Sequence, residues 1–127
     1  MSQLLAIGLG AVLGAWLRHG LALWLNRITW AGHVPLGTLT ANWVGAFLIG
    51  GLLGATVLLE SLRPEWRLAI QVGFLGALTT FSTWSAEAVA MVLAEAWGAL
   101  GLHLLLHAGG SIAATLAGMA LVARWLK

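Results

Sequence analysis

The residues of this chain that could do chemistry are few, and most of them are hydroxyls in one short segment. Five hydroxyl side chains occur within seven residues around Phe81, namely Thr79, Thr80, Ser82, Thr83 and Ser85. Hydroxyls compete for backbone groups and bend helices, and the upstream Gly73 and Gly76 loosen a helix further. The segment therefore predicts one of two structures. Either the helix is interrupted and its free backbone groups serve ions, or it is kinked and the hydroxyls bond their own carbonyls.

Two further sets of polar residues occur at helical spacing. Thr38 and Asn42 are four residues apart and share a helix face. The Asn42 amide could donate hydrogen bonds to an anion, although an interhelical hydrogen bond is the simpler explanation. The second set recurs every four residues and predicts a polar track along one helix: His103, His107, Ser111 and Thr115.

The two histidines of this track could bind a metal, since they stand at i and i+4. No glutamate of the HExxH type separates them, and no further Asp, Cys or His is near them in the sequence, so we do not expect a metal site there. Glu87 is the only acid expected near a membrane interior, and Arg18 is its basic counterpart. Each could extend to the membrane interface or stand at the mouth of a pathway.

No arrangement typical of an enzyme is present. The sequence has no Ser-His-acid spacing, no paired carboxylates and no glycine-rich phosphate loop. It has no cysteine, which excludes disulfides, thiolate metal sites and cysteine nucleophiles. An enzyme is therefore not expected.

The elements that must position these residues follow from the composition. Of 127 residues 61% are hydrophobic and 8% are charged, against about 25% charged in soluble domains. A soluble globule, a disordered chain and a nucleic-acid-binding module are therefore excluded. A helix needs about 20 mostly apolar residues to cross a bilayer, and four stretches qualify, at about 4–25, 36–59, 68–94 and 98–123. They do not alternate as β-barrel strands do, and they predict one all-α domain of four transmembrane helices in a lipid bilayer.

Charge and small residues predict how these helices are arranged. Most of the basic residues fall on the side of the termini, which favours cytoplasmic termini: Arg63, Arg67, Arg124 and Lys127. Small residues at four-residue spacing predict close helix contacts: Gly10 with Gly14, Gly50 with Gly54, and Gly110, Ala114 and Gly118. Four short helices can hardly enclose a pore alone, so we expect an oligomer with a pathway near the subunit contact.

With these features the chain closely resembles the CrcB/Fluc family of fluoride channels. The resemblance covers the whole chain and is carried by GAVLGAWLRH, GTLTANWVG and GFLGALTTFSTW in the first three stretches. It implies an antiparallel (dual-topology) homodimer in the cell inner membrane, with the third helix broken mid-membrane and two fluoride pores per dimer. It also implies passive export of cytoplasmic fluoride, which lowers fluoride toxicity. An oppositely oriented homologue could replace the identical partner.

The resemblance also implies roles for particular residues. The fluoride pore is expected to be lined by Asn42, Thr80, Phe81, Ser82, Trp84, Ser111 and Thr115. Trp84 stands where the family has its second pore phenylalanine. Glu87 and Arg18 are expected at the pore mouth. A structural sodium ion at the dimer centre would be held by the backbone carbonyls of Gly76 and Thr79.

Two other functions compete with this hypothesis. A small multidrug-type proton-coupled antiporter would need an acid inside the first helix, where this chain has only Arg18. A non-transporting membrane subunit would not need the hydroxyl cluster around Phe81. Fluoride efflux from liposomes distinguishes all three.

Overall fold

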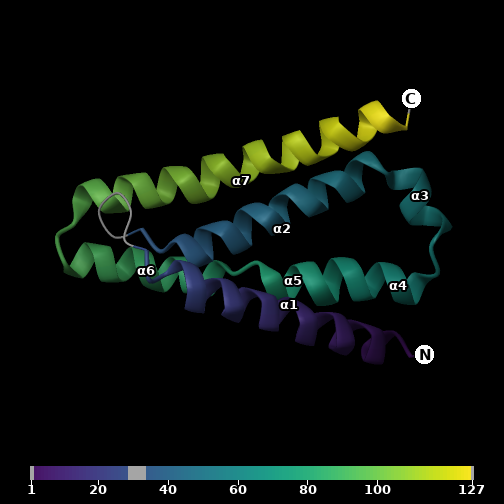
Figure 1. The fold of residues 1–127 in the computed structure, drawn as a ribbon, viewed down its shortest axis with the longest axis horizontal. Coiled ribbons are helices and arrows are strands. Elements are labelled where there is room, and N and C mark those ends of the chain that lie inside the picture. The colour runs from purple at the N-terminus through teal and green to yellow at the C-terminus, as the bar shows by residue number, and fades with distance from the viewer. Residues whose placement is uncertain (1, 29–33, 127) are drawn as a thin grey trace.

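The computed structural model describes residues 2–28 and 34–126, and nearly all of them are helical. The segments in chain order are α1 (Gln3–Leu25), α2 (Leu36–Gly54), α3 (Thr56–Ser61), α4 (Pro64–Leu68), the π-helical η1 (Ala69–Leu75), α5 (Gly76–Leu78), α6 (Phe81–Leu93) and α7 (Trp97–Trp125). Figure 1 shows them as long rods running back and forth, with both termini and the α3–α4 connection at one end. The turn from α6 to α7 lies at the other end.

Within residues 2–28 and 34–126, three helices are long and apolar enough to cross a membrane, and they are α1, α2 and α7. The predicted all-α membrane class is confirmed to that extent. Side-chain hydrogen bonds satisfy backbone N–H groups in the first turns of α1 and α2, locally in α1 and from the end of α1 in α2. The Ser2 hydroxyl accepts the Leu5 N–H at the start of α1 (3.3 Å). Asn26, just after α1, accepts the Gly37 N–H in the first turn of α2 (2.7 Å), which ties the two helices together.

The other two predicted stretches are subdivided. The stretch predicted at 36–59 bends at Ala55 (φ −109°, ψ 36°), where α2 ends and α3 begins. The stretch predicted at 68–94 starts earlier, because Pro64 occupies the first position of α4, where its missing N–H costs nothing. It then continues through η1 and α5 before the backbone becomes extended at Thr79 and Thr80.

Glycines set how closely the helices approach, as predicted from spacing for Gly54, whereas Gly73 was expected only to loosen its helix. A Cβ added to Gly73 would lie 2.5 Å from the Ile7 carbonyl oxygen of α1. One added to Gly54 would lie 2.6 Å from the Met119 carbonyl oxygen of α7. Real Cβ atoms do not approach so closely, so α1 packs on η1, and α2 on α7, only because these positions lack side chains.

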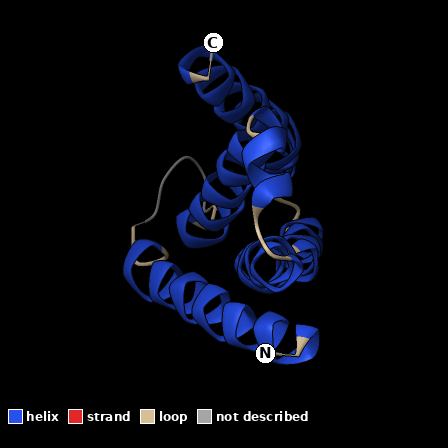
Figure 2. Ribbon diagram, turned by 90° about the vertical axis from the view of Figure 1, so that its right-hand side faces the viewer, coloured by secondary structure: helices blue, strands red, loops and turns tan. Residues whose placement is uncertain are grey.

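The buried apolar residues form two small clusters rather than one large core. One contains Val34, Leu39 and Met91, near the α6–α7 turn. The other contains Ala41, Leu75 and Leu78, where α2 meets the third stretch. Large apolar side chains elsewhere point outward, including Trp16, which is 72% exposed. The end-on view shows α1 and the C-terminal part of α7 on opposite outer sides (Figure 2). Lipid or another protein chain must cover these outer faces.

Candidate functional site

The site is organised by the interruption between α5 and α6. Thr79 (φ −80°, ψ 151°) and Thr80 (φ −147°, ψ 119°) are both extended. Thr80 then caps α6, because its hydroxyl oxygen accepts the Thr83 N–H (3.2 Å). Thr80 is buried, with 7% of its surface exposed, so its own backbone groups need partners inside the protein.

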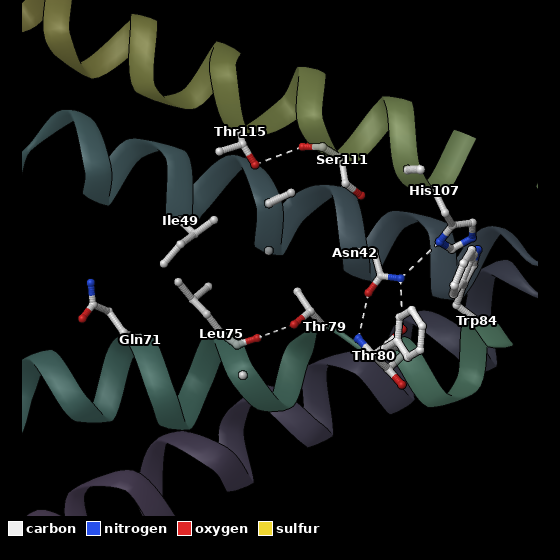
Figure 3. A pocket seen from close by; sticks show the side chains of 15 residues that line it. Asn42, Ile49, Gln71, Leu75, Thr79, Thr80, Trp84, His107, Ser111 and Thr115 are labelled. Carbon is white, nitrogen blue, oxygen red and sulfur yellow. Dashed lines mark hydrogen bonds between the residues drawn. The ribbon is translucent and has the colours of Figure 1, made fainter. Parts of the chain in front are cut away.

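Asn42 on α2 supplies those partners. Its Oδ1 accepts the Thr80 N–H (2.8 Å), and its Nδ2 donates to the Thr80 carbonyl oxygen (3.3 Å). The same Nδ2 lies 3.1 Å from Nδ1 of His107 on α7. One amide therefore holds α2, the interruption and α7 together, as the dashed lines in Figure 3 show.

A second cluster of hydrogen-bonded polar side chains lies next to the contacts of Asn42, on the side of the α6–α7 turn. Thr38 on α2 donates a hydrogen bond to Oε1 of Glu87 on α6. The other carboxylate oxygen, Oε2, lies 3.7 Å from Nε2 of His103. His103 is fully buried, and its Nε2 is also 3.2 Å from the Trp84 carbonyl oxygen.

Glu87 lies close to the two histidines, which was not predicted from the sequence. Ligand-type atoms of Glu87, His103 and His107 all lie within 4.8 Å of one another. A signal was available, because Glu87 and His103 are each eight residues from Glu95, at the turn between the predicted third and fourth spans. In a tight helical hairpin, two residues that are equally far from the turn along the chain lie opposite each other. A ligand-type residue therefore does lie near the histidines, although none is near them in the sequence.

A cavity of about 530 Å³ opens beside the interruption. It lies between α2, the third stretch and α7, and Figure 3 shows the residues around it. The predicted site residues that line it are Asn42, Gly76, Thr79, Thr80, Phe81, Trp84, Ser111 and Thr115. Its remaining lining is mostly small or apolar and includes Gly45, Ala46, Ile49 and Leu75.

Three predicted site residues do not line this cavity. Ser82 is exposed, and its hydroxyl lies 3.3 Å from the Thr80 hydroxyl. Arg18 is half-buried on α1. Glu87 accepts a hydrogen bond from Thr38, and neither residue lines the cavity. Whether Glu87 and Arg18 stand at a pore mouth remains a prediction.

Both structures considered for the hydroxyl cluster occur in part. The Thr79 hydroxyl donates to the Leu75 carbonyl oxygen four residues earlier (3.0 Å), as in a kinked helix. On α7, Thr115 does the same to Ser111 (3.0 Å). The Thr80 hydroxyl instead caps the following helix, as in an interrupted one. The hydroxyls therefore stabilise the edges of the interruption.

Two aromatic rings stand at the cavity beside the interruption. The centroids of Phe81 and Trp84 are 5.0 Å apart, and their planes are tilted by 47°. Phe81 is 76% exposed in the single chain. Aromatic rings are positive at their edges, so an exposed ring edge here can face an anion.

The backbone on the other side of the interruption offers carbonyl oxygens. In a continuous helix the Gly76 carbonyl would accept the Thr80 N–H, but that N–H is donated to Asn42. The Thr83 N–H, which would reach the Thr79 carbonyl, is donated to the Thr80 hydroxyl. Both carbonyls therefore lack a helical donor, and free carbonyl oxygens are suitable ligands for a hard cation such as sodium.

Comparison with known proteins gives a consistent result. The family described as "CrcB-like protein, Camphor Resistance (CrcB)" matches residues 5–119. A Cupriavidus necator protein named "Fluoride-specific ion channel FluC" is 51% identical over 114 residues, covering 90% of this chain and 89% of its own. A Ralstonia pickettii protein of the same name gives the same identity and coverage. A Pseudomonas putida protein, also so named, is 49% identical over 121 residues, covering 94% and 93%.

Proposed function

This chain belongs to the CrcB family, and we propose that it is a fluoride-selective channel that passively exports cytoplasmic fluoride. The relatives are named as ion channels, so the chain is not an enzyme. The observation that carries the proposal is the cavity beside the interruption, lined by Thr80, Phe81, Trp84 and the polar residues of α7. Hydroxyl groups, N–H groups and ring edges can bind a small anion without a fixed positive charge.

The membrane potential supplies the driving force for export, so the protein needs no energy source of its own. In acidic surroundings fluoride enters a cell as neutral HF. In the near-neutral cytoplasm HF loses its proton, and the fluoride anion is trapped there. Moving one negative charge out across about 100 mV is worth roughly 2.3 kcal/mol, or an outward bias of about 50-fold. A passive pathway is therefore sufficient to lower fluoride toxicity.

A second chain is part of the proposal, because the cavity opens to one side of the single chain. Phe81 is 76% exposed, and Gly76, which also lines the cavity, is exposed as well. We infer that an inverted copy of the chain, or an oppositely oriented homologue, closes the pore in the cell inner membrane. The four predicted spans then have the third helix interrupted within the bilayer, where protein or water must surround its free backbone groups.

A sodium ion between the two copies fits the same arrangement. The Gly76 and Thr79 carbonyls of each copy would hold it. Such an ion would supply positive charge that balances the carbonyl dipoles and joins the subunits. This chain's own contribution is the diversion of two backbone N–H groups, to Asn42 and to the Thr80 hydroxyl.

Reconstitution into liposomes tests the function directly. Purified protein is placed in vesicles loaded with fluoride or chloride, and anion efflux is followed with ion-selective electrodes. We expect fluoride efflux with little chloride efflux and no requirement for a proton gradient. Efflux that depends on an imposed proton gradient would support the antiporter instead, and no efflux of either anion would support a non-transporting subunit.

A further inference from the structure

Two buried nitrogen atoms beside the cavity have no hydrogen-bond partner among the described residues. They are Nε1 of Trp84 on α6 and Nε2 of His107 on α7. The two rings are neighbours, with centroids 6.3 Å apart, and both side chains line the cavity. His107 is 5% exposed. A buried donor left without a partner is costly, so these two nitrogens together indicate a binding partner that is not part of this chain.

The hydrogen-bond network determines which of these nitrogens carry hydrogen. The indole nitrogen of Trp84 is always a donor. For His107 the argument begins at Asn42, whose Oδ1 must be the atom that accepts the Thr80 N–H. The amide nitrogen therefore faces His107 Nδ1, which accepts its hydrogen. Neutral His107 then carries its hydrogen on Nε2, the unpartnered atom.

The same hydrogen-bond network makes His107 unsuitable as a metal ligand in the cluster of Glu87, His103 and His107. A metal needs a lone pair on each imidazole nitrogen that binds it. The His107 lone pair at Nδ1 is engaged by Asn42. His103 Nε2 lies between two acceptors, the Trp84 carbonyl oxygen (3.2 Å) and Glu87 Oε2 (3.7 Å), and so it carries hydrogen. His107 therefore presents an N–H group, which suits an anion, whereas Glu87 Oε2 and His103 Nδ1, which also lack a partner among the described residues, are acceptors.

We propose that Trp84 Nε1–H and His107 Nε2–H together bind a fluoride ion at the cavity wall. The proposal rests on the fluoride-channel function above and adds a site built from two donors on neighbouring helices. A phenylalanine at position 84, which the family resemblance would lead one to expect, has no N–H to offer. Small anions of high charge density form the strongest hydrogen bonds, so a pair of N–H donors is suited to fluoride.

The test compares two tryptophans in the full-length protein. In the wild-type protein the indole N–H resonance of Trp84 is identified by its loss in Trp84→Phe, and fluoride and chloride are titrated separately. We expect a saturable shift of this resonance with fluoride and none with chloride. Trp43 is the matched control, since its indole already donates to the Leu106 carbonyl oxygen (2.8 Å), and its resonance should not move.

Flux measurements extend the test. Loss of one hydrogen bond to a charged group predicts that Trp84→Phe raises the half-saturating fluoride concentration by about tenfold or more. Trp43→Phe should leave it unchanged. Glu87→Gln removes the one acidic charge facing the cluster, and an anion site predicts tighter fluoride binding in this variant, whereas a metal site predicts loss of its ligand.

Three results would overturn the proposal. They are a Trp84 resonance that ignores fluoride, an unchanged fluoride dependence in Trp84→Phe, and stoichiometric Zn²⁺ binding that is lost in His107→Leu. The channel function fails separately, if wild-type protein conducts no fluoride. In that case the resonance titration still decides whether the site exists.

Discussion

Replacing Asn42 by alanine tests whether one amide holds the interruption in place. The substitution removes three interactions together, with the Thr80 N–H, the Thr80 carbonyl oxygen and His107 Nδ1. Thr80 and His107 are both buried, with 7% and 5% of their surfaces exposed, so water cannot easily replace the lost partner. We expect Asn42→Ala to lower the free energy of unfolding and to abolish fluoride efflux.

The size of the effect follows from these contacts. Interhelical hydrogen bonds in membrane proteins average about 0.6 kcal/mol. A buried group left without any partner costs about 1–3 kcal/mol. Three interactions, two of them with the backbone of a buried residue, therefore predict a loss of about 2–4 kcal/mol, because movement of neighbouring side chains can restore part of what is lost.

The assay is reversible unfolding in mixed detergent micelles, followed by tryptophan fluorescence, with fluoride efflux from liposomes measured on the same preparations. Trp43→Phe is the matched control, because it is the next residue on α2 and loses a single interhelical hydrogen bond, to the Leu106 carbonyl oxygen. That variant should lose about 0.6 kcal/mol and retain efflux. The reasoning is refuted if Asn42→Ala is no less stable than Trp43→Phe and still conducts fluoride.

Three further variants test the packing, the helix cap and the pore. Gly73→Val places a Cβ 2.5 Å from a carbonyl oxygen of α1 and should cost about 1–3 kcal/mol in the same titration, whereas Gly8→Val, with open space around it, should cost little; equal effects would contradict the packing argument. Thr80→Val removes the side-chain cap of α6 and should cost about 1 kcal/mol; an unchanged unfolding midpoint would show that the cap is dispensable. Phe81→Ile should abolish efflux while the proposed dimer persists in size-exclusion chromatography, and Phe47→Ile, outside the cavity lining, should retain both; an unfolded Phe81→Ile would place that ring in the core instead.

The long helices could be predicted from the sequence because length and apolarity alone determine them. The segment predicted at 98–123 corresponds to α7, Trp97–Trp125, and the one at 4–25 corresponds to α1, Gln3–Leu25. The hydroxyls and glycines before Phe81 also indicated where the third stretch departs from a regular helix. These are local signals, which a single sequence carries.

The partners of the polar residues could not be predicted, because they depend on distant parts of the chain. Asn42 and Thr80 are 38 residues apart, and Thr38 and Glu87 are 49 apart. Spacing indicated that Thr38 and Asn42 share a face, but not what that face meets. For the same reason the sequence left open whether the segment is kinked or interrupted, a choice that depends on the Asn42 amide.

Both chain ends emerge at the same end of the molecule, beside the α3–α4 connection (Figure 1). A gene fusion that joins two copies through a short linker would therefore force them to point the same way. Such a tandem protein could not reproduce the inverted pair proposed above. To do so, the linker would need a membrane crossing of its own, of about 20 apolar residues.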